Sequence, residues 1–136
     1  MNIFQIAVSV GLVSSLVASA SAGSVAEIWE GSMRQIEVNG EMDFPISVTF
    51  SGGKATSKYE SLSCGGEWTR IGGTSPDYVI YKETITYGSV NDPDTGSCID
   101  GVVIVSRRNG KLVLGWFANF EGEPILAAAE LAKAAQ

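Results

Sequence analysis

Two cysteines are the residues whose chemistry separates the possible classes of protein most sharply. Cys64 lies in the stretch SLSCGGEWT, and Cys98 lies further along in GSCIDG. A zinc site would need histidine or more cysteines, and the chain contains no histidine. A reactive thiolate would need a cation or a helix N-terminus nearby, and Arg70 is the nearest cation along the chain. An even number of cysteines in an exported chain is instead typical of a disulfide, so we expect a Cys64–Cys98 bridge, with free thiols as the alternative.

The absence of histidine also removes every catalytic scheme that needs an imidazole as acid or base. Carboxylates remain, and Glu83 is the one whose position suggests a role. Its strand alternates, and the face that holds it is the more apolar of the two, comprising Val79, Tyr81, Glu83, Ile85 and Tyr87. A buried carboxylate needs a partner or a raised pKa, so Arg70 and Arg34 are its expected partners. A structural role is the first interpretation, and orientation of a ligand inside a cavity is the second.

Aromatic residues could line such a cavity. Trp68, Tyr81 and Trp116 are the candidates to face the interior close to Glu83. Aromatic walls would suit an apolar ligand or a sugar ring, although packing in the core is the more common role of such residues. We expect neither a metal ion nor a cofactor, because no set of metal ligands with suitable spacing is present.

The first 22 residues are typical of an export signal. They contain no charged side chain, and the apolar run from Ile3 to Val17 is shorter than the roughly 20 residues that span a membrane. Ala20, Ser21 and Ala22 then fit the small-x-small pattern of a signal-peptidase site. We therefore expect residues 1–22 to be a cleaved signal peptide, with a membrane anchor as the alternative. The protein would be periplasmic or secreted, in or beyond a bacterial envelope, with no stable membrane span after cleavage.

The charge of the chain limits its partners. Nine basic residues and 15 acidic residues give a net charge of −6. Binding to nucleic acid needs clustered lysine and arginine, so no nucleic-acid partner is expected. The acidic balance is compatible with a cationic protein partner.

Residues 23–136 are expected to form a single all-β domain. The stretch MDFPISVTF alternates with period two, and Asn109-Gly110 is a strong signal for a tight hairpin turn. Strands joined by short turns favour a small antiparallel up-and-down barrel of the lipocalin or avidin type with about eight strands and one disulfide, and a β-sandwich is the alternative. The expected strands cover residues 27–38, 42–50, 54–60, 63–71, 77–88, 97–107, 111–120 and 124–132.

Two features test this topology. The C-terminal stretch PILAAAELAKAAQ has high helix propensity, yet barrel closure favours a strand there, with residues 132–136 frayed or in a short helix. Bridged cysteines need Cα atoms within about 7 Å of each other. Cys64 and Cys98 must therefore lie at the same end of the sheet.

Four segments together resemble a family of small exported bacterial β-rich domains. They are KYESLSCGGEW, YKETITYG, CIDGVVIV and LVLGWF, and the resemblance runs from about Tyr59 to Phe117. The family pattern has Cys-Gly-Gly and Cys-[Val/Ile]-Asp-Gly motifs and a Leu-x-Trp-x-Trp strand. This chain departs from it in having Phe117 directly after Trp116 rather than a second, spaced tryptophan. The resemblance implies a β-rich fold with the two cysteines paired and an inward, structural Glu83. It implies no activity.

These observations together predict a non-catalytic, exported binding module. A protein partner is the first expectation, and small size, export and acidity are shared with bacterial inhibitors of lysozyme. A small-ligand-binding barrel is the alternative. A hydrolase that uses only carboxylates is the least expected class, because no pair of carboxylates has a suggestive spacing.

Overall fold

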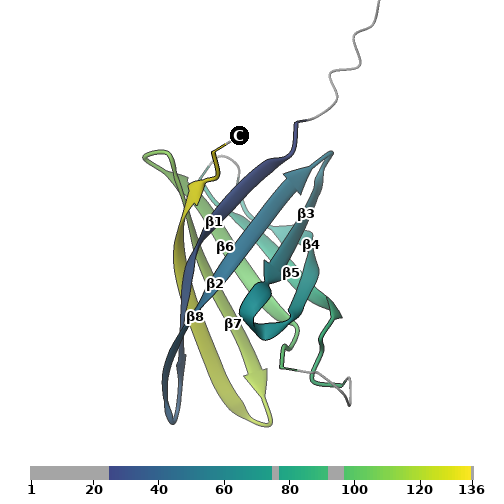
Figure 1. Cartoon of the computed structure of the whole chain (residues 1–136), viewed down its shortest axis with the longest axis vertical. Helices are drawn as coiled ribbons and strands as arrows, with labels where there is room; N and C mark the ends of the chain where they lie inside the picture. Colours follow the sequence, from purple (N-terminus) through teal and green to yellow (C-terminus); the bar gives the residue numbers. More distant parts are fainter. Residues whose placement is uncertain (1–24, 75–76, 92–96, 136) are drawn as a thin grey trace, which may run out of the picture.

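The computed structural model describes residues 25–74, 77–91 and 97–135, and these form one closed antiparallel barrel (Figure 1). Eight strands follow one another along the chain, with a short 3-10 helix, η1 (Glu60–Leu62), after the third. The strands are β1 (Glu27–Glu37), β2 (Gly40–Ser51), β3 (Lys54–Tyr59), β4 (Cys64–Gly72), β5 (Val79–Tyr87), β6 (Gly101–Arg108), β7 (Lys111–Phe120) and β8 (Glu123–Lys133). The predicted up-and-down barrel is confirmed, and the sandwich alternative is excluded.

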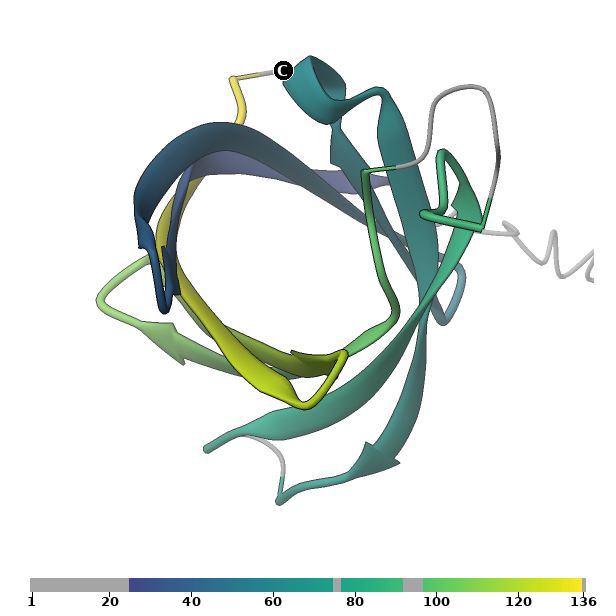
Figure 2. The same ribbon diagram turned by 90° about the horizontal axis from the view of Figure 1, so that it is seen from below.

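Each strand pairs with the next, and β8 pairs with β1 to close the ring (Figure 2). Closure gives every strand a paired neighbour on each side, so the sheet has no edge strand of the kind that an open sheet exposes. The connections β1–β2, β3–β4, β5–β6 and β7–β8 lie at one end of the barrel, which we call the open end. The other connections and both ends of the described chain lie at the opposite end, which we call the closed end (Figure 1).

Most predicted strand boundaries differ from the structure by one or two residues, and the start of the sixth strand differs by four. The sixth strand begins at Gly101 rather than at residue 97, because Cys98 makes only an isolated bridge with Ser89 before the chain enters the barrel. The last strand continues to Lys133, so the predicted fraying from residue 132 is wrong for its first two positions. Pairing of β8 with both β7 and β1 supplies backbone hydrogen bonds that override the helix propensity of this alanine-rich stretch.

The barrel interior is apolar apart from a few positions. Its least exposed apolar side chains are Met33, Val48, Val103, Leu112 and Leu131, each at 1% exposure or less. At the closed end, the Arg107 guanidinium lies over the rings of Trp29 and Phe50 and forms an ion pair with Glu27 at 3.0 Å. These contacts cover the closed end of the core.

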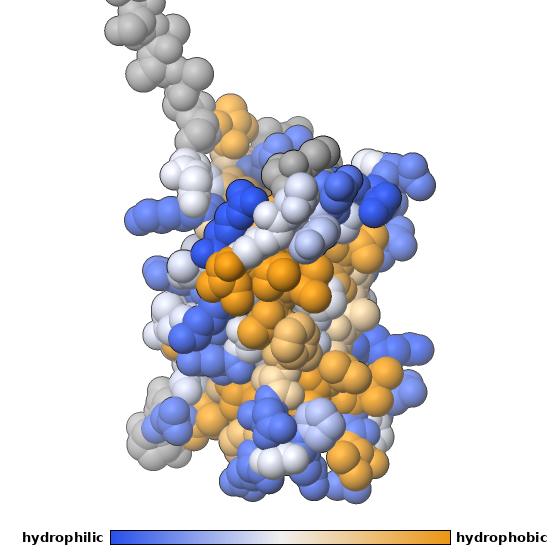
Figure 3. Space-filling view, turned by 180° about the vertical axis from the view of Figure 1, so that it is seen from behind, coloured by the Kyte–Doolittle hydropathy of each residue, from blue (hydrophilic) through white to orange (hydrophobic). Residues whose placement is uncertain are grey.

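The outer face of the barrel is apolar over part of its surface. Ile104 on β6 and Val113 and Phe117 on β7 are each 40–42% exposed. Figure 3 shows apolar side chains gathered on the side of the molecule opposite the view of Figure 1.

The predicted signal peptide, residues 1–22, lies outside the described residues. In the described part of the chain, no helix is long and apolar enough to cross a membrane.

The predicted disulfide is confirmed. Cys64 and Cys98 are bonded, with their Cα atoms 6.3 Å apart. Cys64 is the first residue of β4, and Cys98 lies in the connection between β5 and β6. The bridge therefore ties that connection to the open end of the barrel, as the topology requires.

Replacing both cysteines with serine is expected to lower the free energy of unfolding by about 3–4 kcal/mol, because the unfolded chain then gains the freedom of an open loop. Denaturant unfolding followed by tryptophan fluorescence measures the change. Reduction of the natural protein should lower its stability to the same value. Equal stability of the oxidised, reduced and double-serine forms would contradict the assignment.

Candidate functional site

Glu83 is a buried carboxylate in the middle of the barrel wall. It lies on β5 with 1% of its surface exposed, and it points inward as the alternation of its strand predicts. Ser57 is the other buried polar residue among those described, and it is one of the partners of Glu83. The inside of this barrel thus contains a polar centre that the surrounding chain must satisfy.

Four side chains donate hydrogen bonds to the Glu83 carboxylate. Oε2 accepts from the Ser57 hydroxyl at 2.6 Å and from Trp68 Nε1 at 2.7 Å. Oε1 accepts from Trp116 Nε1 at 3.0 Å, and the Tyr59 hydroxyl lies 3.0 Å from Oε1 and 2.8 Å from Oε2. An ionised carboxylate is an acceptor only, with about four lone-pair sites. The four donors therefore fit the ionised form and occupy its accepting capacity.

The predicted arginine partners of Glu83 are wrong. Arg70 is exposed and donates to the backbone carbonyl oxygen of Gly73, while Arg34 forms an exposed ion pair with Asp43 at 3.1 Å. Arg70 lies two residues beyond Trp68, toward the closed end of β4, where its side chain reaches solvent. Neutral indole and hydroxyl donors satisfy the carboxylate without the cost of burying a guanidinium.

Two glycines leave room for the Glu83 network. A Cβ on Gly101 would lie 2.4 Å from the indole of Trp116, so a side chain there would displace the tryptophan from Glu83. A Cβ on Gly66 would lie 2.5 Å from the carbonyl oxygen of Thr84 and 3.3 Å from Glu83 Cγ. These are the glycines of the CGG and CIDG stretches.

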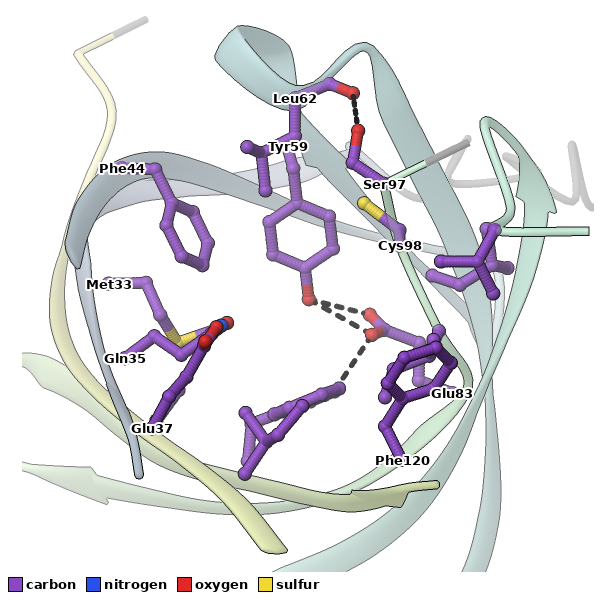
Figure 4. A pocket seen from close by; sticks show the side chains of 16 residues that line it. Met33, Gln35, Glu37, Phe44, Tyr59, Leu62, Glu83, Ser97, Cys98 and Phe120 are labelled. Carbon is purple, nitrogen blue, oxygen red and sulfur yellow. Dashed lines mark hydrogen bonds between the residues drawn. The ribbon is translucent and has the colours of Figure 1, made fainter. Parts of the chain in front are cut away.

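A cavity of about 260 Å³ opens beside this network at the open end of the barrel (Figure 4). Glu83 and Trp116 lie in its wall, together with the aromatic side chains of Phe44, Tyr59 and Phe120. The remaining lining is mostly apolar, and it includes the disulfide through Cys98. The volume lies just below the roughly 300–1,000 Å³ usual for ligand pockets, so the space suits a small molecule.

Glu37 is the second carboxylate of the cavity wall. Together with Gln35 it lies across the cavity from Glu83 (Figure 4). The Gln35 amide donates to the Glu37 carboxylate. Glu37 is exposed, whereas Glu83 is buried, so the two carboxylates occupy the rim and the inner wall respectively.

Tyr59 joins the cavity to the buried network. Its ring packs edge-on against Phe44 with 5.8 Å between ring centroids, and its hydroxyl donates to Glu83. Burial raises the pKa of the Tyr59 phenol well above its usual range, and the negative charge of Glu83 raises it further. Tyr59 is therefore a neutral hydrogen-bond donor at physiological pH.

The three predicted aromatic residues have different positions. Trp116 lines the cavity and binds Glu83. Trp68 also binds Glu83, but it is not part of the cavity wall. Tyr81 packs on Trp68, with 5.4 Å between ring centroids, and borders a shallow hollow at the closed end instead.

Sequence reasoning missed Ser57, Tyr59, Phe44 and Phe120. The stretch KATSKY is polar overall, which hid its inward face of Ala55, Ser57 and Tyr59. Strict alternation along those six residues was the signal that could have found Ser57 and Tyr59.

The two ends of the barrel differ in charge. In the described connections at the open end, counted with the strand residues that flank them, the charged side chains are Glu37, Glu60, Asp100, Glu121 and Glu123. The closed end, counted in the same way with the first and last strand residues, carries Glu27 and Asp77 but also Lys54, Arg108, Lys111 and Lys133. The electrostatic potential is therefore more negative at the open end, where the cavity lies, than at the closed end.

Comparison with known proteins gives no relative. No protein family, curated protein or solved structure matches the chain. Among the described residues, no cluster of three or more potential ligands could hold a metal ion. The geometry of the site is therefore the basis for assigning a function.

Glu83→Gln is expected to destabilise the protein by about 3 kcal/mol or more. The amide nitrogen of glutamine would face buried donors that then lack an acceptor. Denaturant unfolding measures the loss. Glu67→Gln is the matched control, because Glu67 lies exposed on the neighbouring strand β4 and should change stability by less than about 0.5 kcal/mol. Equal effects of the two substitutions would show that the hydrogen-bond network is not a source of stability.

Proposed function

We propose that the protein is a non-catalytic, exported binding module that holds a small ligand in the open end of its barrel. The observation that carries this proposal is the cavity of about 260 Å³ between the buried Glu83 network and the rim. A barrel of eight strands is either filled by its own side chains or holds one small ligand. Here the open end has a cavity that reaches the buried Glu83, whereas the hollow at the closed end is shallow and borders Arg107, which lies over Trp29 and Phe50.

The wall of the cavity supports binding of an organic molecule. Phe44, Tyr59, Trp116 and Phe120 offer aromatic surface, and a few polar groups converge on the same space. This combination of apolar walls and few polar groups is typical of small-molecule sites. The wall is rigid at Tyr59 and Trp116, because both are fixed by hydrogen bonds to Glu83.

The state of Glu83 supports a role in binding rather than catalysis. A general base must have a free lone pair to take a proton from a substrate. The lone pairs of Glu83 already accept four donors from the protein. Glu83 would therefore orient the wall of the site without reacting.

Export belongs to the same proposal. The uncharged first 22 residues and the small residues Ala20 and Ala22 support a cleaved signal, and a disulfide persists best in an oxidising compartment. The resemblance to small exported bacterial domains agrees with a periplasmic or secreted location. The ligand would then be a molecule of the envelope or of the surroundings of the cell.

Ala127→Leu should fill the cavity from β8 and weaken binding of a small apolar probe such as toluene by at least about tenfold. Ala128→Leu is the matched control, because Ala128 is the next residue of the same strand and is exposed on the outer face. Titrations followed by ¹H–¹⁵N spectra report the binding. The indole N–H of Trp116 should shift, whereas that of Trp29 at the closed end should not. Absence of any shift in the natural protein would overturn the proposed function.

A cationic protein partner is the second candidate function, and the acidic open end favours it. Clustered charge of one sign raises the rate of association with a partner of opposite charge. A cationic lysozyme is the first partner to test, since size, export and acidity are shared with bacterial lysozyme inhibitors.

Inhibition of lysozyme is measured in a lytic assay. The natural protein should reduce lysis, and the double variant Glu121→Gln/Glu123→Gln should inhibit less, with a weaker dependence on salt. Full lysozyme activity at high excess of the natural protein would exclude this partner.

A further inference from the structure

We propose that the ligand of the open-end cavity is an organic cation with a fully alkylated ammonium group. This inference rests on the proposed function and specifies its ligand class. It follows from the charges of the cavity wall, from its aromatic side chains and from the hydrogen bonds that already engage Glu83.

The cavity has negative charge without a protein counter-charge. Glu83 and Glu37 are in its wall, and no lysine or arginine lines it among the described residues. In the described part of the chain, the ion pairs involve Glu27 and Asp43 but not Glu83. Hydrogen bonds from neutral donors stabilise the Glu83 carboxylate, but they do not neutralise its negative charge. A positive ligand would therefore gain Coulomb energy from a poorly screened site.

The aromatic residues suit the same ligand. Phe44, Tyr59, Trp116 and Phe120 come from three strands, β2, β3 and β7, and line the cavity. Aromatic faces attract cations, and cages of such residues beside carboxylates recognise alkylated ammonium groups. Met33 adds a polarisable thioether to the wall.

Because the oxygens of Glu83 already accept hydrogen bonds, the site should bind a fully alkylated ammonium group better than a primary one. A primary ammonium carries three N–H donors that need acceptors when water is removed. Glu83 has no accepting capacity left, since four side chains of the protein already donate to it. Glu37 and Gln35 still offer acceptor oxygens, but they lie across the cavity from Glu83, so an ammonium group beside Glu83 does not reach both walls. A trimethylammonium group has no N–H donor, so it can approach this wall without an unpaired polar atom.

The charge of the whole barrel favours entry of a cation from the open end. The described connections there carry carboxylates only, and the basic residues gather at the closed end. Such a distribution concentrates cations at the mouth of the cavity. Anionic molecules of the same size would be repelled.

Three probes of nearly equal shape test the inference. Choline carries a trimethylammonium group, 3,3-dimethylbutan-1-ol replaces the nitrogen with carbon, and 3,3-dimethylbutanoate is an anion of similar bulk. Titrations followed at the Trp116 indole N–H should give an affinity for choline at least about tenfold above that for the alcohol, with no binding of the anion. Ethanolamine, which has a primary ammonium, should bind more weakly than choline.

Glu37→Gln provides the matched test of charge, because Glu37 is exposed and its loss should leave the fold intact. Choline should bind about two- to fivefold more weakly to this variant, while the affinity for the alcohol should not change. Glu41→Gln is the control, because Glu41 is exposed on β2 outside the cavity wall.

The outcomes distinguish the two proposals. Equal affinity for choline and the alcohol would overturn the inference and leave the small-ligand function standing. Stronger binding of the anion would overturn it as well. Failure of toluene and of all these probes to shift Trp116 would remove the proposed function itself.

Discussion

The interior of this barrel is organised around one buried negative charge. Glu83 needs hydrogen-bond donors wherever it lies out of water, because an unsatisfied buried carboxylate would cost more than a small domain has in net stability. Four donors meet it from β3, β4 and β7, so the requirement of one residue on β5 fixes the packing of three other strands. The same requirement holds Tyr59 and Trp116 in place at the wall of the cavity.

The residues of the CGG and CIDG motifs help to position the side chains around Glu83. Gly101 leaves space for the Trp116 indole, and Asp100 accepts a hydrogen bond from the backbone N–H of Ile85 at 2.8 Å, just before β6 enters the barrel. Cys98 ties the same connection to Cys64 at the start of β4. The glycines, the aspartate and the disulfide thus position the open end around the carboxylate, which is a structural reason for these residue types at these spacings.

The two ends of the barrel also differ in their side chains. At the closed end, Arg107 covers Trp29 and Phe50 and is paired with Glu27. At the open end, no cationic side chain enters the cavity wall among the described residues, and the cavity stays accessible beside Glu83. The closed end is therefore covered by an ion-paired arginine, and the open end leaves a cavity without a cationic side chain.

Much of the fold follows from local sequence. Period-two alternation marked strands such as β2, β5 and β7, because side chains of a barrel strand must alternate between core and solvent. Asn109-Gly110 marked the β6–β7 turn. The same alternation turned Glu83 inward, and the count of cysteines gave the bridge. The partners of Glu83 were beyond such reasoning. Charge suggested an arginine, whereas Ser57, Tyr59, Trp68 and Trp116 come together only when the ring closes and sets the register of β3, β4, β5 and β7. The strand conformation of the C-terminal alanines and the hollow at one end were likewise decided by tertiary structure, because closure supplies backbone partners and determines which inward side chains meet and which leave space between them.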